Sequence, residues 1–520
     1  MNKKLSKQRS AFLLALALAL PFTGNPLGGQ FVPVYAAEQN VADSYTMEKI
    51  PDVIPSDVIG LRTNGAKIIE KKPVLTTEGK IAFYAVRGLI FPVDSKAENI
   101  EFQVNLPAEW NKKLAQFGGG AFNGTLVSAD GHPIGADKAD VPPVLQGYVT
   151  YGSDGGHKAG TWESEWALND ENLRNFAHEQ LKKTHDVAVY LAKQFYGQAP
   201  QKSYFIGGSN GGREGLKAAQ EYPDDYDGVV SFYPVLNWVP KAIKDHENAM
   251  NVLQNNGAGW LSESEYELVK HVVLEVTDKL DGKEDGLIGD VSKADEKKAE
   301  IIKRLQGHLS KAKLETLEKF WSARNYSQPL KNDFHRLPGY SVSQLLIDHG
   351  EPFSYNQFGT EKGKRDGTMM MFSDGVIAHQ IVRRKNYNVD DFKPEQWKKE
   401  ILAASSLLDA TNVNLDLFVK HGGKLILLHG TADEVVAIQG TTDYYKKLAE
   451  RYGEKLAAFS RYYMVPGFGH ETGSVFTMGR DLLKDLDDWV VSGKAPENLA
   501  VKDQNKKTYG RIQVLHPYVW

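Results

Sequence analysis

The stretch KSYFIGGSNGGREGLKAAQEY, from Lys202 to Tyr222, constrains the fold more than any other part of this chain. An apolar strand pattern runs into two glycines, Ser209 follows on a tight bend, and an amphipathic helix pattern begins at once. Glycines suit such a bend because larger side chains would clash there. The letters fit G-x-S-x-G, and a strand before and a helix after are typical of a turn that exposes a nucleophilic serine. A purely structural glycine-rich turn is the alternative.

Strand patterns alternate with helix patterns along much of the chain. Strand-like alternation runs through residues 79–92 and 99–107. Residues 175–197 carry apolar side chains at helical spacing and end in Gly197, which is typical of a helix C-cap. This alternation predicts an α/β fold, with a mostly parallel sheet covered by helices on both faces.

One charge-rich segment interrupts the α/β pattern. Residues 237–400 hold helical patterns and few clear buried strands, and the α/β pattern returns after them. We therefore predict a core built from residues 37–236 and 401–520, interrupted by a large, mainly helical insertion. Most aromatic residues of the insertion are expected in its hydrophobic core, and they include Trp260, Phe320, Trp321, Tyr326, Phe334, Tyr340, Phe353, Tyr355 and Phe358.

The first 36 residues have the features of an export signal. Basic residues precede the apolar run AFLLALALAL, and Val34-Tyr35-Ala36 offers a cleavage site. The run is too short to span a bilayer comfortably, although a retained signal anchor is the alternative. We expect residues 1–36 to be a signal peptide, and the rest to be secreted from a bacterial cell or held in its cell-wall zone without stable membrane insertion.

Composition excludes several classes of protein. The formal net charge of the 520 residues is only -4, and we find no basic, aromatic-interleaved patch, which argues against nucleic acid as a partner. The chain has no cysteine, so disulfides and thiolate metal sites are excluded. Nothing in the sequence indicates an oligomeric state.

A serine hydroxyl is a poor nucleophile without a base, and two later residues offer the missing groups. Asp433 follows the apolar run KLILLHG, and His470 follows RYYMVPGFG. In an α/β-hydrolase the acid and then the histidine follow the serine, each in a loop after a late strand. We therefore predict a catalytic triad of Ser209, Asp433 and His470. Taken singly, Asp433 also suits a helix N-cap and His470 a loop histidine, while His429 is interpreted as structural.

Acyl transfer also needs hydrogen-bond donors for the oxyanion that develops on the substrate. The backbone N–H of Asn210 directly follows the candidate nucleophile. A second donor is expected from the glycine run FGGGAFNG, where Gly119 and Gly120 are the candidates. A plain turn is the alternative for this run.

The stretch TDKLDGKEDGLIGD combines carboxylates with glycines inside the insertion. Asp278, Asp281 and Asp285 are spaced as in a calcium loop, where glycines turn carboxylates and backbone carbonyls inward. The spacing is not that of an EF-hand, and no terminal glutamate stands at the right distance. From the residues alone, a solvated acidic loop is an equal alternative to a metal site.

Taken together, these blocks resemble the tannase and feruloyl esterase family over most of the mature chain. The serine block, GGKLILLHGTADEVVAIQGTTDYY, YYMVPGFGH and FGGGAFNG are similar to that family's nucleophile, acid, histidine and oxyanion blocks. The resemblance implies an α/β-hydrolase sheet domain with an inserted lid, and hydrolysis of esters of hydroxylated aromatic acids such as gallate or ferulate. It also implies a structural calcium ion in the lid, bound by Asp278, Asp281 and Asp285 and by the backbone carbonyls of Lys283 and Leu287.

The chain departs from the family at one pair of positions. The family has a cysteine just before the serine and one just after the histidine, joined as a disulfide, where this chain has Gly208 and Glu471. We expect packing or hydrogen bonds to replace the bridge while the triad stays intact. The expected activity is that of a secreted serine esterase acting on small aromatic esters. The alternatives are a hydrolase of aliphatic or polyester-oligomer esters, a peptidase, and a non-catalytic binding protein on the same scaffold.

Overall fold

The computed structural model describes residues 46–346, 357–470, 475–506 and 508–520. Contacts within the chain divide it into Met1–Gln39 and Asn40–Trp520, and every described element belongs to the second unit. The predicted signal peptide, residues 1–36, therefore lies outside the described residues.

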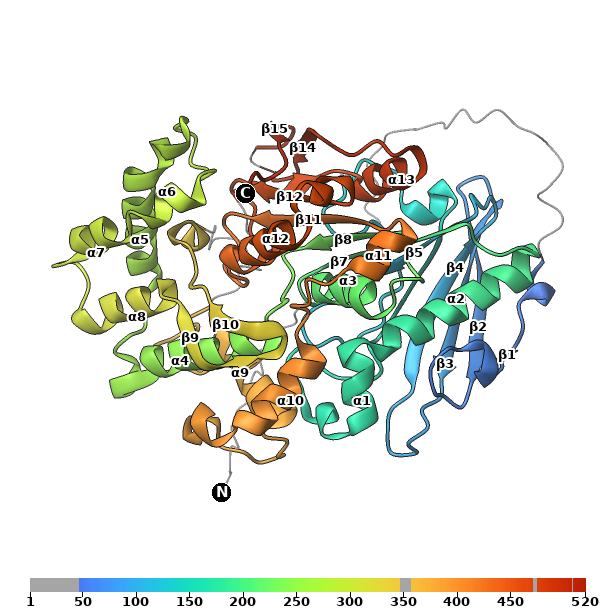
Figure 1. The fold of residues 1–520 in the computed structure, drawn as a ribbon, viewed down its shortest axis with the longest axis horizontal. Coiled ribbons are helices and arrows are strands. Elements are labelled where there is room, and N and C mark those ends of the chain that lie inside the picture. The colour runs from blue at the N-terminus through green and yellow to red at the C-terminus, as the bar shows by residue number, and fades with distance from the viewer. Residues whose placement is uncertain (1–45, 347–356, 471–474, 507) are drawn as a thin grey trace, which may run out of the picture. The chain divides into compact units, whose positions relative to one another are not determined.

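A ten-stranded mixed sheet forms the centre of this unit (Figure 1). Its strands are β1 (Val53–Ile54), β2 (Ala66–Leu75), β3 (Ile81–Ile90), β4 (Ile100–Pro107), β5 (Lys113–Phe117), β6 (Val149–Ser153), β7 (Lys202–Gly208), β8 (Gly228–Phe232), β11 (Lys424–Gly430) and β12 (Ser460–Val465). They lie in the order β1-β2-β3-β4-β6-β5-β7-β8-β11-β12. Pairing is antiparallel from β1 to β6 and parallel from β6 to β12. The predicted α/β fold is confirmed, but the sheet, predicted to be mostly parallel, is mixed, because four of its nine neighbouring strand pairs are antiparallel.

Helices cover both faces of the sheet, because successive strand residues point to opposite sides. The helices next to the sheet are α2 (Gln180–Tyr196), α3 (Asn210–Glu221), α11 (Asp416–His421), α12 (Ile438–Tyr452) and α13 (Leu482–Ser492), and the short α1 (Asp170–Arg174) precedes α2 in the chain. On one face, Phe205, Val229 and Leu425 pack with residues of α3, α11 and α12. The helix expected to end at Gly197 is confirmed, since Gly197 caps α2 with φ 74°.

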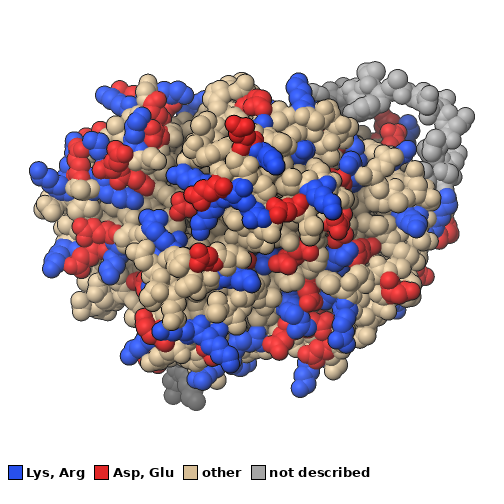
Figure 2. All heavy atoms as spheres, in the orientation of Figure 1, with Lys and Arg blue, Asp and Glu red and all other residues tan. Residues whose placement is uncertain are grey.

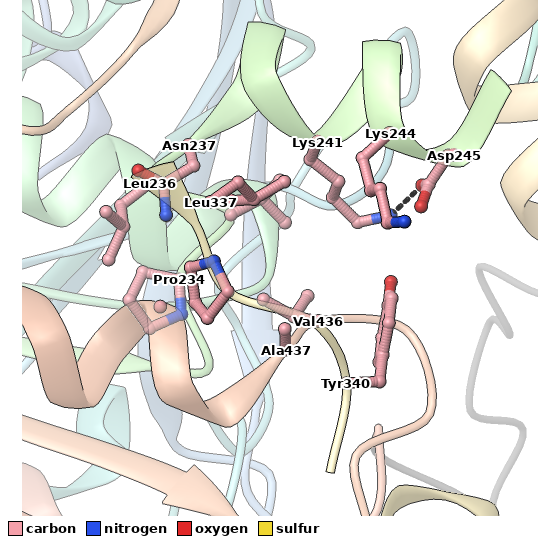
Figure 3. A pocket seen from close by; sticks show the side chains of 13 residues that line it. Pro234, Leu236, Asn237, Lys241, Lys244, Asp245, Leu337, Tyr340, Val436 and Ala437 are labelled. Carbon is pink, nitrogen blue, oxygen red and sulfur yellow. Dashed lines mark hydrogen bonds and ion pairs between the residues drawn. The ribbon is translucent and has the colours of Figure 1, made fainter. Parts of the chain in front are cut away.

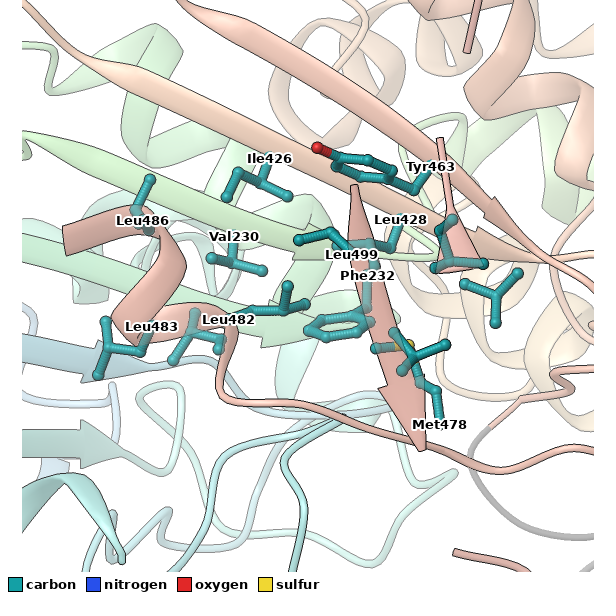
Figure 4. Packing of buried hydrophobic residues seen from close by; sticks show 14 of the residues in the cluster. Val230, Phe232, Ile426, Leu428, Tyr463, Met478, Leu482, Leu483, Leu486 and Leu499 are labelled. Atoms are coloured by element: carbon teal, nitrogen blue, oxygen red, sulfur yellow. The ribbon is translucent and has the colours of Figure 1, made fainter. Parts of the chain in front are cut away.

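The other face of the sheet packs against α13 and a small antiparallel sheet (Figure 4). That sheet consists of β13 (Met478–Gly479), β14 (Leu499–Asp503) and β15 (Ile512–Leu515). Figure 4 shows Val230 and Phe232 of β8 beside Leu482 of α13, with Met478 and Leu499 nearby. This buried layer lies beneath the strand ends from which the candidate catalytic loops start.

The segment between β8 and α11 is the inserted region. It contains α4 (Trp238–Gly257), α5 (Glu263–Thr277), α6 (Val291–Asp295), α7 (Lys298–Leu305), α8 (Lys311–Trp321), α9 (Thr368–Gly375), α10 (Lys398–Leu408) and a hairpin of β9 (Arg324–Leu330) and β10 (Phe334–Leu337). It has a hydrophobic cluster of its own and shares a second cluster with the sheet domain. Of the aromatic residues expected in the core, Phe320, Trp321, Phe334, Tyr340 and Phe358 are buried, while Phe353 and Tyr355 lie outside the described residues.

The surface carries both signs of charge. On the face drawn in Figure 2, lysine and arginine side chains are interspersed with aspartate and glutamate side chains. Within the described residues, none of the helices is both long enough and apolar enough to cross a membrane.

Candidate active site

Ser209 occupies the sharp turn between β7 and α3, as the glycine pattern predicts. Its backbone adopts φ 60° and ψ -119°, a conformation that non-glycine residues rarely adopt. A Cβ atom on Gly207 would lie 2.6 Å from the carbonyl oxygen of Gly211, and one on Gly211 would lie 2.6 Å from the carbonyl oxygen of Gly119. The glycines therefore allow strand, turn and helix to approach closely, and they hold the serine at the carboxyl edge of the sheet.

Asp433 and His470 meet at the same edge, in the loops that follow β11 and β12. The Nδ1 atom of His470 lies 3.1 Å and 3.0 Å from the two carboxylate oxygens of Asp433. Both side chains are buried. The backbone N–H groups of Val435 and Val436 also donate to Asp433 Oδ1, each at 2.9 Å. The carboxylate is therefore fixed by its own loop and faces one ring nitrogen of the imidazole.

A second imidazole contacts the same carboxylate. His429, which the sequence indicates as structural, places Nε2 3.3 Å from Asp433 Oδ2 and Nδ1 2.8 Å from the hydroxyl of Thr441. Burial by itself would raise the pKa of Asp433, but the two imidazoles lower it below its ordinary value. The arrangement keeps Asp433 ionised, which is the state needed to stabilise a charged His470.

Glu434 is a buried acid that sequence analysis did not identify. Its Oε2 accepts a hydrogen bond from the backbone N–H of His470 at 3.3 Å. Burial, and then the negative charge of Asp433, raise the pKa of Glu434 to about 8. The pKa values of these two neighbouring carboxyl groups are therefore shifted in opposite directions. Glu434 is protonated at neutral pH, while Asp433 is ionised.

A buried glutamate connects the glycine loop to the start of α3, the two segments predicted to form the oxyanion hole. Glu214, on α3, accepts hydrogen bonds from Gly119 N at 3.0 Å and from the side-chain amides of Asn123 at 2.8 Å and Asn210 at 3.3 Å. The N–H of Gly119 is therefore directed at Glu214. A Cβ on Gly120 would meet no atom within 4 Å, so the backbone of Gly120 borders open space. Because the N–H of Gly119 is engaged with Glu214, Gly120 remains the candidate for the second oxyanion donor.

The insertion contacts the loop that carries Asp433. Gln344 donates from Nε2 to the backbone carbonyl of Asp433 and, at 2.7 Å, to that of Val436. Ser343 Oγ donates to the carbonyl of Thr431 at 2.6 Å, and Tyr340 donates its hydroxyl proton to the carbonyl of Val435 at 2.6 Å. The inserted region therefore helps to hold the candidate acid in place.

A small cavity lies between the start of α4 and the loop that carries Asp433 (Figure 3). It measures about 30 Å³ and is lined by residues that include Asn237, Lys241, Asp245, Tyr340 and Val436. Lys241 and Asp245 form a buried ion pair at its wall, which Figure 3 shows beside the ring of Tyr340. A space of this size holds about one water molecule, so it is not a pocket for an aromatic ester.

The predicted calcium loop has its carboxylates turned toward backbone N–H groups. Asp278 accepts from Gly286 N at 3.0 Å, Asp281 accepts from Gly289 N at 2.8 Å, and Asp285 accepts from Leu287 N at 3.1 Å. Burial, and to a smaller extent the charges of Asp285 and Asp281, raise the pKa of Asp278. The three carboxylates are therefore held by backbone N–H groups of their own loop.

Among the described residues, the group whose three ligand atoms all lie within 4.8 Å of one another is His185, Asp186 and Asp225. The acids of the predicted calcium loop do not reach that spacing. At His185, the ammonium of Lys182 lies 2.7 Å from Asp186 Oδ1 and 3.1 Å from Asp225 Oδ1. A lysine therefore already supplies the positive charge in that cluster.

Comparison with known proteins matches the family model "Tannase and feruloyl esterase" to residues 84–519. The chain belongs to the tannase and feruloyl esterase family. It is 33% identical to an esterase of Agrobacterium fabrum, over 94% of this chain and 92% of that one. The matched region includes the loops of all three predicted triad residues, so the chain is a carboxylic ester hydrolase of this family.

Other relatives agree with the family, and one solved structure has a similar fold. A probable feruloyl esterase of Arthroderma benhamiae is 27% identical over 76% of this chain and 73% of its own length. The mono(2-hydroxyethyl) terephthalate hydrolase of Piscinibacter sakaiensis is 26% identical over 82% and 79%. A tannin acyl hydrolase from Aspergillus niger has a similar fold, with a TM-score of 0.72, 19% identity and 93% of both chains covered. The α/β-hydrolase fold expected from the resemblance is confirmed.

Of the two positions where the resemblance implies a disulfide, one belongs to the described part of the chain. Gly208 is the last residue of β7 and directly precedes Ser209. Glu471 lies outside the described residues.

Proposed function

We propose that this chain is a secreted serine esterase that hydrolyses esters of hydroxylated aromatic acids, with Ser209, His470 and Asp433 as its triad. The observation that carries the proposal is the pairing of His470 Nδ1 with the buried carboxylate of Asp433 at 3.0 Å. That pair lies at the sheet edge where the strained turn of Ser209 also lies, because β7, β8, β11 and β12 are parallel neighbours.

The proposed reaction follows from these positions. Ser209 Oγ attacks the ester carbonyl while His470 Nε2 takes the hydroxyl proton, and Asp433 stabilises the resulting imidazolium. The backbone N–H groups of Asn210 and Gly120 stabilise the negative oxygen of the tetrahedral intermediate. His470 returns the proton to the departing alcohol. A water molecule, activated in the same way, then releases the aromatic acid and restores the serine.

The choice of aromatic substrates rests on the family and on the names of its members. One relative is named a probable feruloyl esterase, and a structural neighbour is a tannin acyl hydrolase. A third protein acts on mono(2-hydroxyethyl) terephthalate, which is also an aromatic ester. That relative favours polyester oligomers as the second candidate substrate class.

A substrate panel separates these candidates. Initial rates are measured with methyl gallate, methyl ferulate, mono(2-hydroxyethyl) terephthalate and a short p-nitrophenyl ester, for the wild type and Ser209→Ala. We expect hydrolysis of the gallate or ferulate ester, and a loss of at least about 10³-fold in the variant. Activity on the terephthalate ester alone would transfer the assignment to polyester oligomers. An active Ser209→Ala enzyme would refute the serine mechanism.

We also propose that the loop from Asp278 to Leu287 binds a structural calcium ion. Its support is the set of three neighbouring carboxylates and two glycines, Gly282 and Gly286, whose φ values of 91° and 76° reverse the backbone inside the loop. Asp278, Asp281 and Asp285 would supply carboxylate oxygens, and Lys283 and Leu287 would supply carbonyl oxygens. Oxygen ligands of this kind are those that calcium prefers.

Secretion is proposed from the N-terminal sequence. A basic region, a short apolar run and a small-residue site are the parts of a cleaved signal. N-terminal sequencing of protein recovered from the culture medium tests this, with a start at Ala37 expected. Recovery of the whole chain in the membrane fraction would favour the retained anchor.

A further inference from the structure

Tyr233 lies between the serine turn and the histidine loop. It directly follows β8, its side chain is fully buried, and its backbone has φ 29°, which is unusual for a residue with a side chain. The strand edge fixes it, since its backbone N–H donates to the carbonyl of Leu428 at 2.7 Å. A strained backbone held by its surroundings points to a side chain whose direction matters.

On one side, the ring of Tyr233 fills the space beside Gly208. A Cβ atom built on Gly208 would lie 2.9 Å from Cε2, 3.1 Å from Cζ and 3.1 Å from the hydroxyl oxygen of Tyr233. All three nearest atoms belong to this one side chain. The ring of Tyr233 therefore occupies the space that a side chain at position 208 would need.

On the other side, the ring packs on the candidate general base. Its centroid lies 4.5 Å from that of His470, with an angle of 48° between the planes, and 5.9 Å from that of Phe468 in the same loop. The ring of His429, the second imidazole on Asp433, lies 6.4 Å away. A single buried side chain thus lies beside the residue before the nucleophile, the loop that carries His470 and the strand that leads to Asp433.

We propose that Tyr233 is a positioning residue that links the serine turn to His470 by ring packing, and that Gly208 is required because it makes room for that ring. The inference rests on the proposed function, since it assumes that His470 is the base for Ser209. Packing of this kind restricts the imidazole from one face, while Asp433 fixes its Nδ1 edge, so the other ring nitrogen keeps its direction toward the serine. The link joins two segments that are far apart in sequence without a covalent bond.

The test begins with two substitutions that disturb the contact from opposite sides. Tyr233→Leu removes the ring, and Gly208→Ala adds one methyl group against it. Both variants are expected to lower kcat about 10- to 100-fold with less than a threefold change in KM. The rate of Ser209 labelling by a fluorophosphonate, which needs no ester binding pocket, is expected to fall in parallel. Tyr233→Phe keeps the ring and is expected to retain at least a third of the wild-type kcat.

Matched controls separate positioning from a general loss of stability. Tyr226→Leu removes another fully buried tyrosine, and Gly131→Ala adds a methyl group where no atom lies within 4 Å. We expect Tyr226→Leu to lower the melting temperature as much as Tyr233→Leu while its labelling rate stays near wild type. Gly131→Ala should change neither quantity.

The double variant Gly208→Ala/Tyr233→Leu tests the link directly. If the alanine acts only through the ring, the double variant is no slower than Tyr233→Leu alone. The proposal would be overturned if the kcat reductions of the two single variants multiplied in the double variant. A Tyr233→Leu enzyme with wild-type kcat, or a Tyr233→Phe enzyme as slow as Tyr233→Leu, would overturn it too. If Tyr233→Leu fails to fold, a Gly208→Ala enzyme with wild-type kcat would overturn it as well. Ser209→Ala, measured alongside, reports on the proposed function independently.

Discussion

At the scale of single residues, the site contains three buried acids, and each is stabilised by a different set of neighbouring groups. Asp433 is ionised beside two imidazoles, Glu434 is protonated beside Asp433, and Glu214 accepts hydrogen bonds from the glycine loop and from Asn210. The burial of Glu434 and Glu214 could not be predicted from one sequence, because a glutamate in a helix or loop is usually exposed. The positions of Ser209, Asp433 and His470 at the edge of the sheet were predictable, because each follows a strand pattern in the sequence.

Glu214→Gln should weaken both stability and activity. The partners of Glu214 are all donors, namely Gly119 N and the amides of Asn123, Asn210 and Gln180. The NH2 group of the glutamine would face some of these donors in place of a carboxylate oxygen. A buried group that loses its hydrogen bond in this way costs about 1–3 kcal/mol. We expect that loss in urea unfolding and a fall in kcat of about 10-fold, because the oxyanion loops lose their common anchor. Glu450→Gln, an exposed helical control, should change neither; an unaltered kcat in Glu214→Gln would rule out the anchoring role.

Glu434→Gln should change how stability depends on pH. The pKa of Glu434 is raised from 4.5 to about 8, so between these values the folded state binds a proton that the unfolded state has released. This contribution to stability is present below pH 4.5 and is lost as the pH rises through about 8. Glutamine imitates the protonated acid at every pH. The melting temperature of the wild type should therefore fall relative to Glu434→Gln between pH 5 and pH 9, and parallel curves would contradict the assignment.

At the scale of elements, periodic patterns predicted the segments that the sheet buries. The strand and helix around Ser209 became β7 and α3, and the helix pattern ending at Gly197 became α2. The β9–β10 hairpin was not predicted, since β9 is mostly exposed and polar and has no buried face to reveal it. The contacts of Gln344 with the Asp433 loop were equally invisible, because they join segments 89 and 92 residues apart.

The acidic loop of the insertion should respond to calcium. Leu287, at its end, is buried in the cluster beneath the sheet, and a Cβ on Gly467 would lie 2.4 Å from it. The loop therefore packs on the segment that leads to His470. We expect calcium to raise the melting temperature and a chelator to reverse the rise. At a calcium concentration of 100 times the dissociation constant, the free energy of unfolding should increase by about 2.7 kcal/mol.

Two variants define the calcium prediction. Asp281→Asn should abolish the calcium-dependent rise, whereas Asp57→Asn, at an exposed site outside the loop, should keep it. Magnesium is the control ion, because it demands a smaller octahedral site. A melting temperature that is identical with calcium and with chelator would leave the loop as a solvated acidic turn.

At the scale of the whole molecule, the insertion and the sheet domain share a hydrophobic cluster. Trp238 of α4 packs its ring 5.3 Å from Phe176 and 5.8 Å from Phe122 in the sheet domain, and 5.0 Å from Phe372 in α9. Its indole N–H donates to Gln380 at 2.8 Å. The sequence predicted the insertion as a separate segment, but not that its first helix would enter the core of its host.

Trp238→Ala should therefore destabilise the insertion and the sheet domain together. Truncating a buried tryptophan costs about 3–5 kcal/mol. Because the cluster spans both parts, we expect one calorimetric transition in the wild type and one, at lower temperature, in the variant. Trp520→Ala, at a side chain that is half exposed, should shift it little. Two separate transitions in either protein would show that the parts unfold independently.

The ring of Tyr233 beside Gly208 also bears on where this enzyme can mature. A site joined by a disulfide needs an oxidant and the correct pairing of thiols before it is complete. This chain has no cysteine, so its serine turn and histidine loop come together by folding alone. Thiol reagents have no target in it, and its assembly needs no thiol oxidant. Completion of the candidate site therefore does not depend on the redox state of the compartment in which the chain folds.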